Sequence, residues 1–271
     1  MARCAIMGCS NPPHAYFEEY HEAFIARLSA DGHELDTRFL DRTIGQEYRT
    51  HAGRLWRIAP RIRAQILNEL FADPDIDVIL DISGGDLANE ILPLLDWDTI
   101  AQHPKPFVGY SDLTTIVNAI VTRTQQQAVL WSPRAMLERP QGDVSRILAG
   151  QRIRPHILGE HELPDVPIIG GHLRCLAKLV GTPYLPTSDE RLVICESLGG
   201  GLEHAASYFQ QLSMAGLFDN AVGLILGQFT GIDADEDRPH LVELAQEITR
   251  LPIWHAPQVG HSRDCEPVTI G

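Results

Sequence analysis

One serine of the chain stands where a nucleophile could act. In Lys105–Thr114 a short apolar run ends at Gly109, Tyr110 and Ser111 follow, and apolar residues at helical spacing begin at once. A strand that turns into a helix across one serine exposes the hydroxyl and directs the first free N–H groups of the helix at the atom under attack. The turn is close to the G-x-S-x-G motif that exposes nucleophilic serines, with Leu113 in place of the second glycine. The same pattern also fits an ordinary helix start.

Two further polar turns follow apolar runs in the N-terminal half. Residues 3–8 lead into a proline-stopped loop that contains Ser10, and residues 77–82 lead into Gly84 and Gly85. Parallel strands place such loops at one edge of a sheet, so we expect both turns to lie near the serine turn. Ser10 and Gly84 are candidate substrate contacts. The N–H of Gly85 is a candidate oxyanion donor, although a glycine pair before a helix is often only a tight turn.

The elements that must position these residues alternate along the chain. Strands are predicted at 3–8, 34–40, 77–82, 106–110, 128–131, 191–196 and 222–229, and helices at 54–71, 87–95, 112–124, 204–217 and 240–251. This alternation predicts the α/β class, with an N-terminal doubly wound, mainly parallel sheet of flavodoxin or Rossmann type. A smaller C-terminal α/β domain with a mixed sheet should follow. Prolines gather between the two, so the predicted division is 1–135, a linker at 136–166, and 167–271.

Composition excludes several classes of protein. The 271 residues carry a formal net charge of −14, which offers no basic surface to a nucleic acid. No apolar run approaches the roughly 20 residues that span a bilayer, and no signal peptide precedes the first strand. The five cysteines form no C-x-x-C pair, which is typical of reduced thiols. We therefore expect a cytoplasmic protein that binds neither nucleic acid nor membrane.

With these segments placed, the chain resembles the LD-carboxypeptidase family of serine peptidases, which includes the microcin C self-immunity proteins. Four stretches carry the resemblance. They are Gly109-Tyr110-Ser111-Asp112; the Ser-Gly-Gly and Leu-Leu-Asp-Trp-Asp sequences within 81–98; Gly170–Pro186, which ends Leu-Val-Gly-Thr-Pro-Tyr-Leu-Pro; and Leu192–Glu196 with the segments 215–219 and 224–230. The similarity extends over nearly the whole chain.

The resemblance implies a Ser-His-Glu triad with Ser111 as nucleophile, Glu196 as the orienting acid and His261 as the general base. It also implies an oxyanion hole made by the N–H groups of Asp112 and of Gly85 or its neighbour. A triad needs these residue types because an imidazole must take the serine proton and a carboxylate must fix its tautomer. The acid and base would then come from the C-terminal domain and the nucleophile from the N-terminal one.

The chain departs from the family pattern at several places, two of which bear on the site. His172 stands where the resemblance predicts an asparagine, and Ser207 stands where relatives often carry an arginine.

Each of these residues also has a simpler interpretation. Glu196 follows four apolar residues and could be an ordinary carboxylate at a strand end, and His261 is one of 12 histidines. Trp131 could line the cleft or belong to the core. His261 and Cys265 have a spacing that could bind a metal, but two ligands do not make a site, so no metal and no organic cofactor is expected.

These observations predict a serine hydrolase that cleaves an amide bond near the carboxyl end of a small peptide-like substrate. Within the family the substrate could be a murein tetrapeptide or a peptidyl nucleotide, and the lack of an aromatic residue in Ser83–Asp86 favours the latter slightly. Family members are often homodimers, so a homodimer is expected as well. The alternative is an inert small-molecule binding or regulatory protein on the same scaffold.

Overall fold

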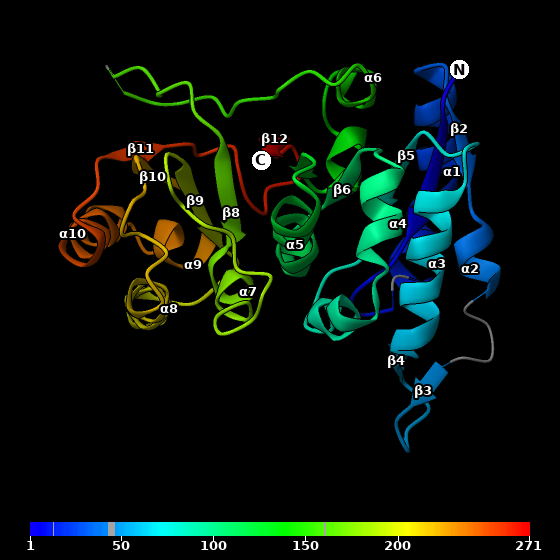
Figure 1. Ribbon diagram of the computed structural model, residues 1–271, viewed down its shortest axis with the longest axis horizontal. Helices are drawn as coiled ribbons and strands as arrows, with labels where there is room; N and C mark the ends of the chain where they lie inside the picture. Colours follow the sequence, from blue (N-terminus) through cyan, green and yellow to red (C-terminus); the bar gives the residue numbers. More distant parts are fainter. Residues whose placement is uncertain (13, 43–46, 160) are drawn as a thin grey trace.

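A computed structural model describes residues 1–12, 14–42, 47–159 and 161–271 of the chain. Its described residues form two larger sheets, with helices packed against both, and a separate two-stranded hairpin (Figure 1). The N-terminal half builds one sheet, and residues after 167 build the other, with the exception of the last strand. The α/β class and the mainly parallel first sheet predicted from the sequence are confirmed.

The first sheet has six strands in the order β12-β7-β6-β5-β1-β2. Its members are β1 (Arg3–Met7), β2 (Glu34–Asp36), β5 (Val78–Asp81), β6 (Phe107–Gly109), β7 (Ala128–Leu130) and β12 (Val268–Ile270). All neighbours are parallel except β12, which runs antiparallel to β7. The strands β1, β5 and β6 are short and mainly apolar, because both faces of the sheet are covered there.

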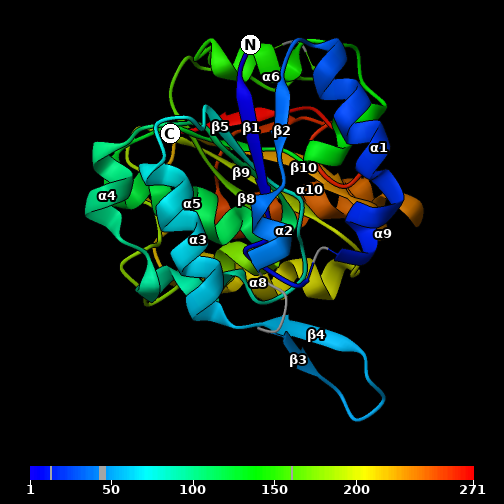
Figure 2. The same ribbon diagram turned by 90° about the vertical axis from the view of Figure 1, so that its right-hand side faces the viewer.

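Successive residues of β1 point into two different cores, as in a doubly wound sheet. Cys4 and Ile6 pack with α1 (His14–Ala30), η3 (Pro133–Leu137) and α6 (Asp143–Leu148). Ala5 and Met7 face the opposite core. That core takes residues from α3 (Pro60–Ala72), η1 (Ala88–Leu94), α4 (Trp97–Gln102) and α5 (Thr114–Thr124). Figure 2 shows α1 on one side of the sheet and α3 to α5 on the other.

The second sheet has four strands in the order β11-β10-β9-β8. They are β8 (Ile168–His172), β9 (Leu192–Ser197), β10 (Gly223–Phe229) and β11 (Ile253–His255). All three pairings are parallel, so the predicted mixed sheet is wrong for this half. The reason is that the segment between each pair of successive strands contains a helix, as parallel crossovers require. The first crossover contains α7 (Leu173–Ala177), and the second contains α8 (Leu202–Met214). The third contains α9 (Thr230–Ala234) and α10 (Arg238–Thr249).

The predicted helix at 54–71 is also only partly correct. Residues Leu55–Ile58 form strand β4, which pairs antiparallel with β3 (Glu47–Arg49), and the helix begins at Pro60. Proline favours the first turn of a helix, and so it marks the true start. The β3–β4 hairpin extends away from the body of the fold in Figure 2. The predicted strand at 34–40 is likewise shorter, because α2 (Arg38–Arg42) begins within it.

The two halves share one apolar core and pack along α5, β8 and α7. The larger core cluster runs from Ala5 of the first sheet to Ile225 of the second. Asn118 of α5 uses its side-chain amide to bond both the N–H and the C=O of Gly170, each at 2.9 Å. The strand β12, at the end of the predicted C-terminal domain, pairs within the first sheet. The division into 1–135, 136–166 and 167–271 stays a prediction. None of the helices in the described ranges is long and apolar enough to cross a membrane.

Candidate active site

Ser111 lies at the turn between β6 and α5 and has a left-handed backbone. Its φ is +57°, whereas Tyr110 before it is extended. Non-glycine residues adopt this conformation only when the surrounding structure enforces it, and such strain gathers at functional sites. Gly109 allows the turn to close, because a Cβ there would lie 2.7 Å from the Cβ of Leu113. The local structure is therefore a strained strand-to-helix turn that presents the hydroxyl.

The structure brings Ser111, His261 and Glu196 together from three distant parts of the chain. The Nε2 of His261 lies 3.2 Å from the Oγ of Ser111, and its Nδ1 lies 2.7 Å from the Oε2 of Glu196. The side chains of His261 and Glu196 are 6% and 1% exposed. With the carboxylate as acceptor, Nδ1 carries the proton and the Nε2 lone pair faces the serine hydroxyl. This arrangement can move a proton away from Ser111.

Two residues that the sequence did not single out hold His261 in place. The ring of Tyr110 packs on its imidazole with centroids 4.4 Å apart. Gln228 of β10 accepts the N–H of Ser262 at 2.8 Å and donates to the C=O of Pro257 at 2.8 Å, so it ties both sides of the histidine loop to the second sheet. Burial raises the pKa of the Tyr110 phenol well above its usual range, which keeps it protonated.

The Gly84-Gly85 turn lies against the serine. A Cβ on Gly84 would be 3.9 Å from the Cβ of Ser111. Gly85 has φ +124°, and a Cβ there would collide with the side chain of Asn11. Asn11 brackets the turn, since its N–H donates to the Gly84 C=O at 3.2 Å and its Oδ1 accepts the Asp86 N–H at 3.0 Å. The turn therefore lies beside the serine, and the oxyanion role of Gly85 stays a prediction.

Asp112 follows the serine and is fully buried, and its side chain is the centre of a polar network. Its Oδ2 accepts from the Ser10 hydroxyl at 2.6 Å and from the Ala88 N–H at 2.8 Å, while its Oδ1 accepts from the Lys178 ammonium at 2.5 Å. The carboxylate thus joins the turns after β1, β5 and β6 to α7. Its backbone, at the start of the helix, remains available for the predicted oxyanion role.

Helix α7 reaches across from the second half to hold the two turns. Arg174 pairs with Asp86 and donates to the Gly85 C=O at 3.2 Å, and Lys178 donates to the Asp86 C=O at 3.1 Å. The hydrogen bond from Arg174 lowers the pKa of the Asp86 carboxyl. No local pattern in the sequence predicted these contacts, because they join residues roughly 90 positions apart.

The structure does not place Ser10 and Trp131 where a substrate could touch them. Ser10 is 0% exposed, and its hydroxyl is committed to Asp112 and to the Leu87 N–H. Trp131 is 1% exposed, and its indole N–H donates to the C=O of Cys265 at 2.9 Å. Both are corrected here from substrate contacts to framework residues, since a side chain without exposed surface cannot meet a ligand directly.

A cavity of about 730 Å³ opens over the serine. It is lined by Asn11, Pro12, Arg54, Leu55, Trp56, Ile82, Gly84, Gly85, Asp86, Leu87, Tyr110, Ser111, Arg134, Leu198 and His261. Gly84 and Gly85 therefore lie at the cavity, as predicted for a substrate-binding turn. Arg54 and Trp56 come from the β3–β4 hairpin, which the sequence had placed in a helix.

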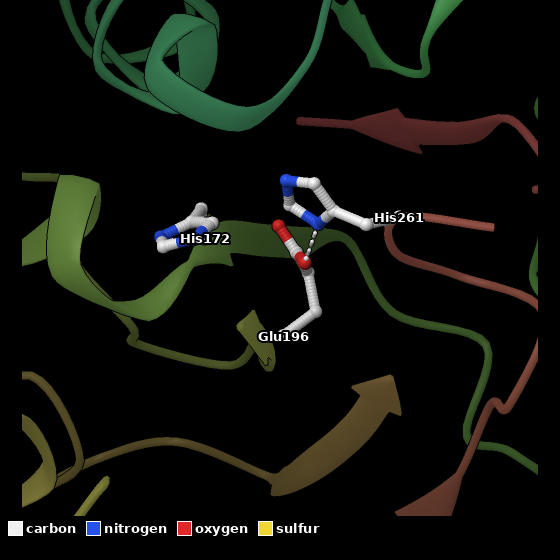
Figure 3. A group of neighbouring side chains, drawn as sticks. All are labelled: His172, Glu196 and His261. Atoms are coloured by element: carbon white, nitrogen blue, oxygen red, sulfur yellow. Dashed lines mark hydrogen bonds and ion pairs between the residues drawn. The ribbon is translucent and has the colours of Figure 1, made fainter. Parts of the chain in front are cut away.

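His172, Glu196 and His261 form a group with the composition of a metal site. One ligand atom from each lies within 4.8 Å of the others (Figure 3). However, the Nε2 of His172 accepts the Leu198 N–H at 3.2 Å, and the Nδ1 of His261 is bonded to Glu196. Both ring nitrogens of His261 are engaged, one with Glu196 and the other with Ser111, so a metal bound to His261 would displace one of these contacts. The observed contacts therefore fit a polar network better than a metal centre.

The fold and this geometry define an α/β protein in which a serine and a histidine line a cavity and a buried glutamate contacts the histidine. The family model for the LD-carboxypeptidase N-terminal domain matches residues 4–130, and the model for the C-terminal domain matches residues 166–271. The chain belongs to the LD-carboxypeptidase family, as the resemblance predicted.

Individual relatives agree with this assignment. The murein tetrapeptide carboxypeptidase of Pseudomonas aeruginosa is 26% identical over 272 residues, covering 92% of this chain and 86% of that protein. The microcin C7 self-immunity protein MccF of Escherichia coli is 47% identical over 62 residues, covering 23% of this chain and 18% of that protein. The solved complex of MccF with aspartyl sulfamoyl adenosine superimposes with a TM-score of 0.79 at 20% identity, over 100% of this chain and 91% of that one. The last likeness shows a shared fold.

Proposed function

We propose that the protein is a serine peptidase that hydrolyses an amide bond near the carboxyl end of a small peptide-like substrate. The observation that carries the proposal is the continuous contact Ser111–His261–Glu196, at 3.2 and 2.7 Å, with Ser111 and His261 on the wall of the 730 Å³ cavity. Membership of a carboxypeptidase family supports the same reaction class. The expected location in the cytoplasm and the expected homodimer stay predictions from the sequence.

The reaction proceeds in two steps. The Oγ of Ser111 attacks the carbonyl carbon while the Nε2 of His261 takes its proton, and Glu196 stabilises the resulting imidazolium. The N–H groups of Asp112 and Gly85 donate to the oxyanion. The tetrahedral intermediate collapses, the proton passes from His261 to the leaving amine, and an acyl-enzyme remains on Ser111. Water, deprotonated by His261, then releases the acid product and restores the serine.

The cavity suggests which substrate the site accepts. Arg54 and Trp56 bring a cation and a large aromatic face to the wall that also carries Ser111. A guanidinium suits an anionic group, and an indole suits a planar ring, which are the two parts of a nucleotide conjugate. We propose a peptidyl nucleotide as the substrate, with the murein tetrapeptide as the alternative. The chain's net charge of −14 makes a local arginine at the cavity more significant for an anionic substrate.

A serine-directed phosphonate probe tests the reaction class. We expect stoichiometric labelling of Ser111, loss of labelling and of hydrolysis in Ser111→Ala, and unchanged behaviour in the matched control Ser213→Ala on α8. If the wild-type protein is not labelled, and Ser111→Ala hydrolyses the substrate as fast as wild type, the proposal is wrong and an inert binding protein becomes the better description.

Two substrates separate the two proposed chemistries. The protein is incubated with a disaccharide-free murein tetrapeptide and with an aminoacyl sulfamoyl nucleotide, and the release of D-alanine or of the free amino acid is followed by mass spectrometry. We expect turnover of the nucleotide conjugate. Exclusive turnover of the tetrapeptide would contradict the assignment of Arg54 and Trp56 to a nucleotide.

A further inference from the structure

Two buried polar atoms beside the triad have no hydrogen-bond partner within the described part of the chain. They are the Nδ1 of His172 and the Oε1 of Glu196. The two side chains are 3% and 1% exposed, so water in bulk does not reach them. Buried polar atoms are normally satisfied, and an unpaired one in a native fold calls for an explanation.

The two atoms belong to neighbouring positions of the second sheet. His172 ends β8 and is paired in register with Glu196 near the end of β9, so their side chains leave the sheet together. Figure 3 shows the carboxylate of Glu196 between the imidazole rings of His172 and His261. The two rings have centroids 5.3 Å apart.

Hydrogen bonding at the other nitrogen of His172 determines where its proton lies. The Leu198 N–H donates to Nε2 at 3.2 Å, so Nε2 presents its lone pair. Burial lowers the pKa of His172, which leaves the ring neutral near pH 7. A neutral imidazole with an acceptor Nε2 must carry its proton on Nδ1. The unpaired atoms are therefore one donor and one acceptor, which complement each other.

We propose that His172 is a positioning residue whose Nδ1–H holds the Oε1 of Glu196 through one bridging water, while Oε2 accepts from His261. This inference rests on the proposed function. One ring nitrogen of each histidine and one carboxylate oxygen of Glu196 lie within 4.8 Å of one another, a span that a single water can bridge. Both oxygens of the carboxylate would then be held, which fixes the direction in which it presents Oε2 to His261. The negative charge would also be shared between two histidines.

Other titratable groups surround this pair and must be considered in its pH dependence. His172 is faced by Glu196, His261, Arg174 and Asp112, and Glu196 is near Tyr110, Cys195 and Cys265. Burial raises the pKa of the phenol and of both thiols, so these three stay neutral between about pH 5 and 8.

Two substitutions of His172 test the inference by kinetics. His172→Phe keeps the ring volume and removes both nitrogens. We expect kcat to fall by about 10- to 100-fold with KM within about 2-fold, since one hydrogen bond to a buried charged group is lost. The acid limb of the pH–rate profile should move to higher pH, because a carboxylate with one donor fewer favours protonation of the Glu196–His261 pair. His172→Gln retains an N–H donor and should recover part of kcat.

The matched control is His240→Phe on α10, whose side chain is 65% exposed and should leave both kcat and the profile unchanged. A fall in kcat of His172→Phe without any movement of the acid limb would indicate only a packing role and would overturn the inference.

A measurement on the wild-type protein does not depend on the variants folding. Side-chain ¹⁵N NMR of histidine should show His172 with a protonated Nδ1 and an unprotonated Nε2. The opposite tautomer, or tight binding of added Zn²⁺ to this group, would contradict the proposal. Failure of the proposed function appears separately, as absent labelling of Ser111, and leaves the tautomer measurement intact.

Discussion

The backbone conformation of Ser111 and the burial of Glu196 both depend on neighbouring groups. Ser111 keeps a left-handed backbone, and Glu196 is 1% exposed with one oxygen on His261. Such strain and such burial are costly, and they persist only when neighbouring groups compensate them. For Glu196 the compensation comes from the imidazole of His261, whose Nδ1 lies 2.7 Å from its Oε2.

The contribution of the carboxylate is predicted from that argument. Glu196→Gln keeps the shape but presents an amide to Nδ1 and favours the wrong tautomer, so kcat should fall by about 10³- to 10⁴-fold with little change in KM. Steady-state kinetics measure this. The exposed Glu203→Gln on α8 is the control and should retain full activity. A decrease of less than about 10-fold for Glu196→Gln would argue against a role in orienting His261.

At the scale of elements, the β3–β4 hairpin contributes Arg54, Leu55 and Trp56 to the cavity wall and extends away from the two larger sheets. Its orientation is set by Arg57, which pairs with Glu90 at 2.8 Å and stacks 5.3 Å from the Tyr48 ring and 5.8 Å from the Trp56 ring. Glu90 in turn pairs with the buried Arg63 of α3. These ion pairs connect the hairpin to α3 and to η1, the helix that follows the Gly84-Gly85 turn.

This connection predicts a measurable role for the hairpin in substrate binding. Trp56→Ala should raise KM for a nucleotide conjugate by about 5- to 150-fold, the range for the loss of one stacked base, while phosphonate labelling of Ser111 stays unchanged. Trp56→Phe retains a ring and should lie between the two. Arg54→Ala should weaken binding in the same assay, with the exposed Arg61→Ala as its control. Unchanged KM in both Trp56→Ala and Arg54→Ala would exclude this subsite.

Helix α7 is the second element with a clear task, since it joins the halves at the catalytic turns. Lys178→Met would leave the fully buried Asp112 carboxylate without its cation and should lower the free energy of unfolding by about 3 to 5 kcal/mol. Urea denaturation provides the measurement. The double variant Lys178→Met/Asp112→Asn should lose less than the sum of the single variants, because no charge is then left unpaired. Strict additivity would show that the two side chains do not interact.

At the scale of the whole molecule, the two sheets behave as one body with a shared core. The larger cluster contains residues of β1, β5 and β6 together with residues of β8, β9 and β10. In its last strand, β12, the chain returns from the second half to the first sheet, where β12 pairs with β7. Thr269 of β12 also forms two hydrogen bonds with the backbone of Ile153. Ser111, which follows β6, and His261, in the loop between β11 and β12, can therefore stay in contact although they come from different halves of the chain.

A shared core predicts that the protein unfolds in one transition. Leu226→Ala in β10 is fully buried and should destabilise the whole molecule by about 2 to 5 kcal/mol. In single-tryptophan variants, the fluorescence of Trp131, beside the first sheet, and that of Trp254, in the second, should report the same urea midpoint of unfolding. Two separate midpoints would show instead that the halves unfold independently.

The local features of the fold were accessible to sequence reasoning because they depend on neighbouring residues. Apolar runs and helical spacing placed β1, β5, β6, α5 and β9, and the Gly-Tyr-Ser turn lies at the predicted strand-to-helix boundary. The predicted helix was wrong at residues 54–58, where Leu55 and Ile58 match a helical spacing but form a strand before Pro60. It also assigned a mixed sheet to the second half, although the antiparallel strand joins the first.

The sequence by itself therefore determined that a serine stands on a strand-to-helix turn, that the fold is α/β, and, through its resemblance to a family, which acid and base to expect. Only the tertiary structure decided which side chains meet. Ser111 and His261 are 150 positions apart and Glu196 and His261 are 65 apart, and no local pattern encodes such contacts. The same holds for Ser10 and Trp131, which are buried beneath the site, and for His172 beside Glu196, because burial and strand register arise only when the chain is folded.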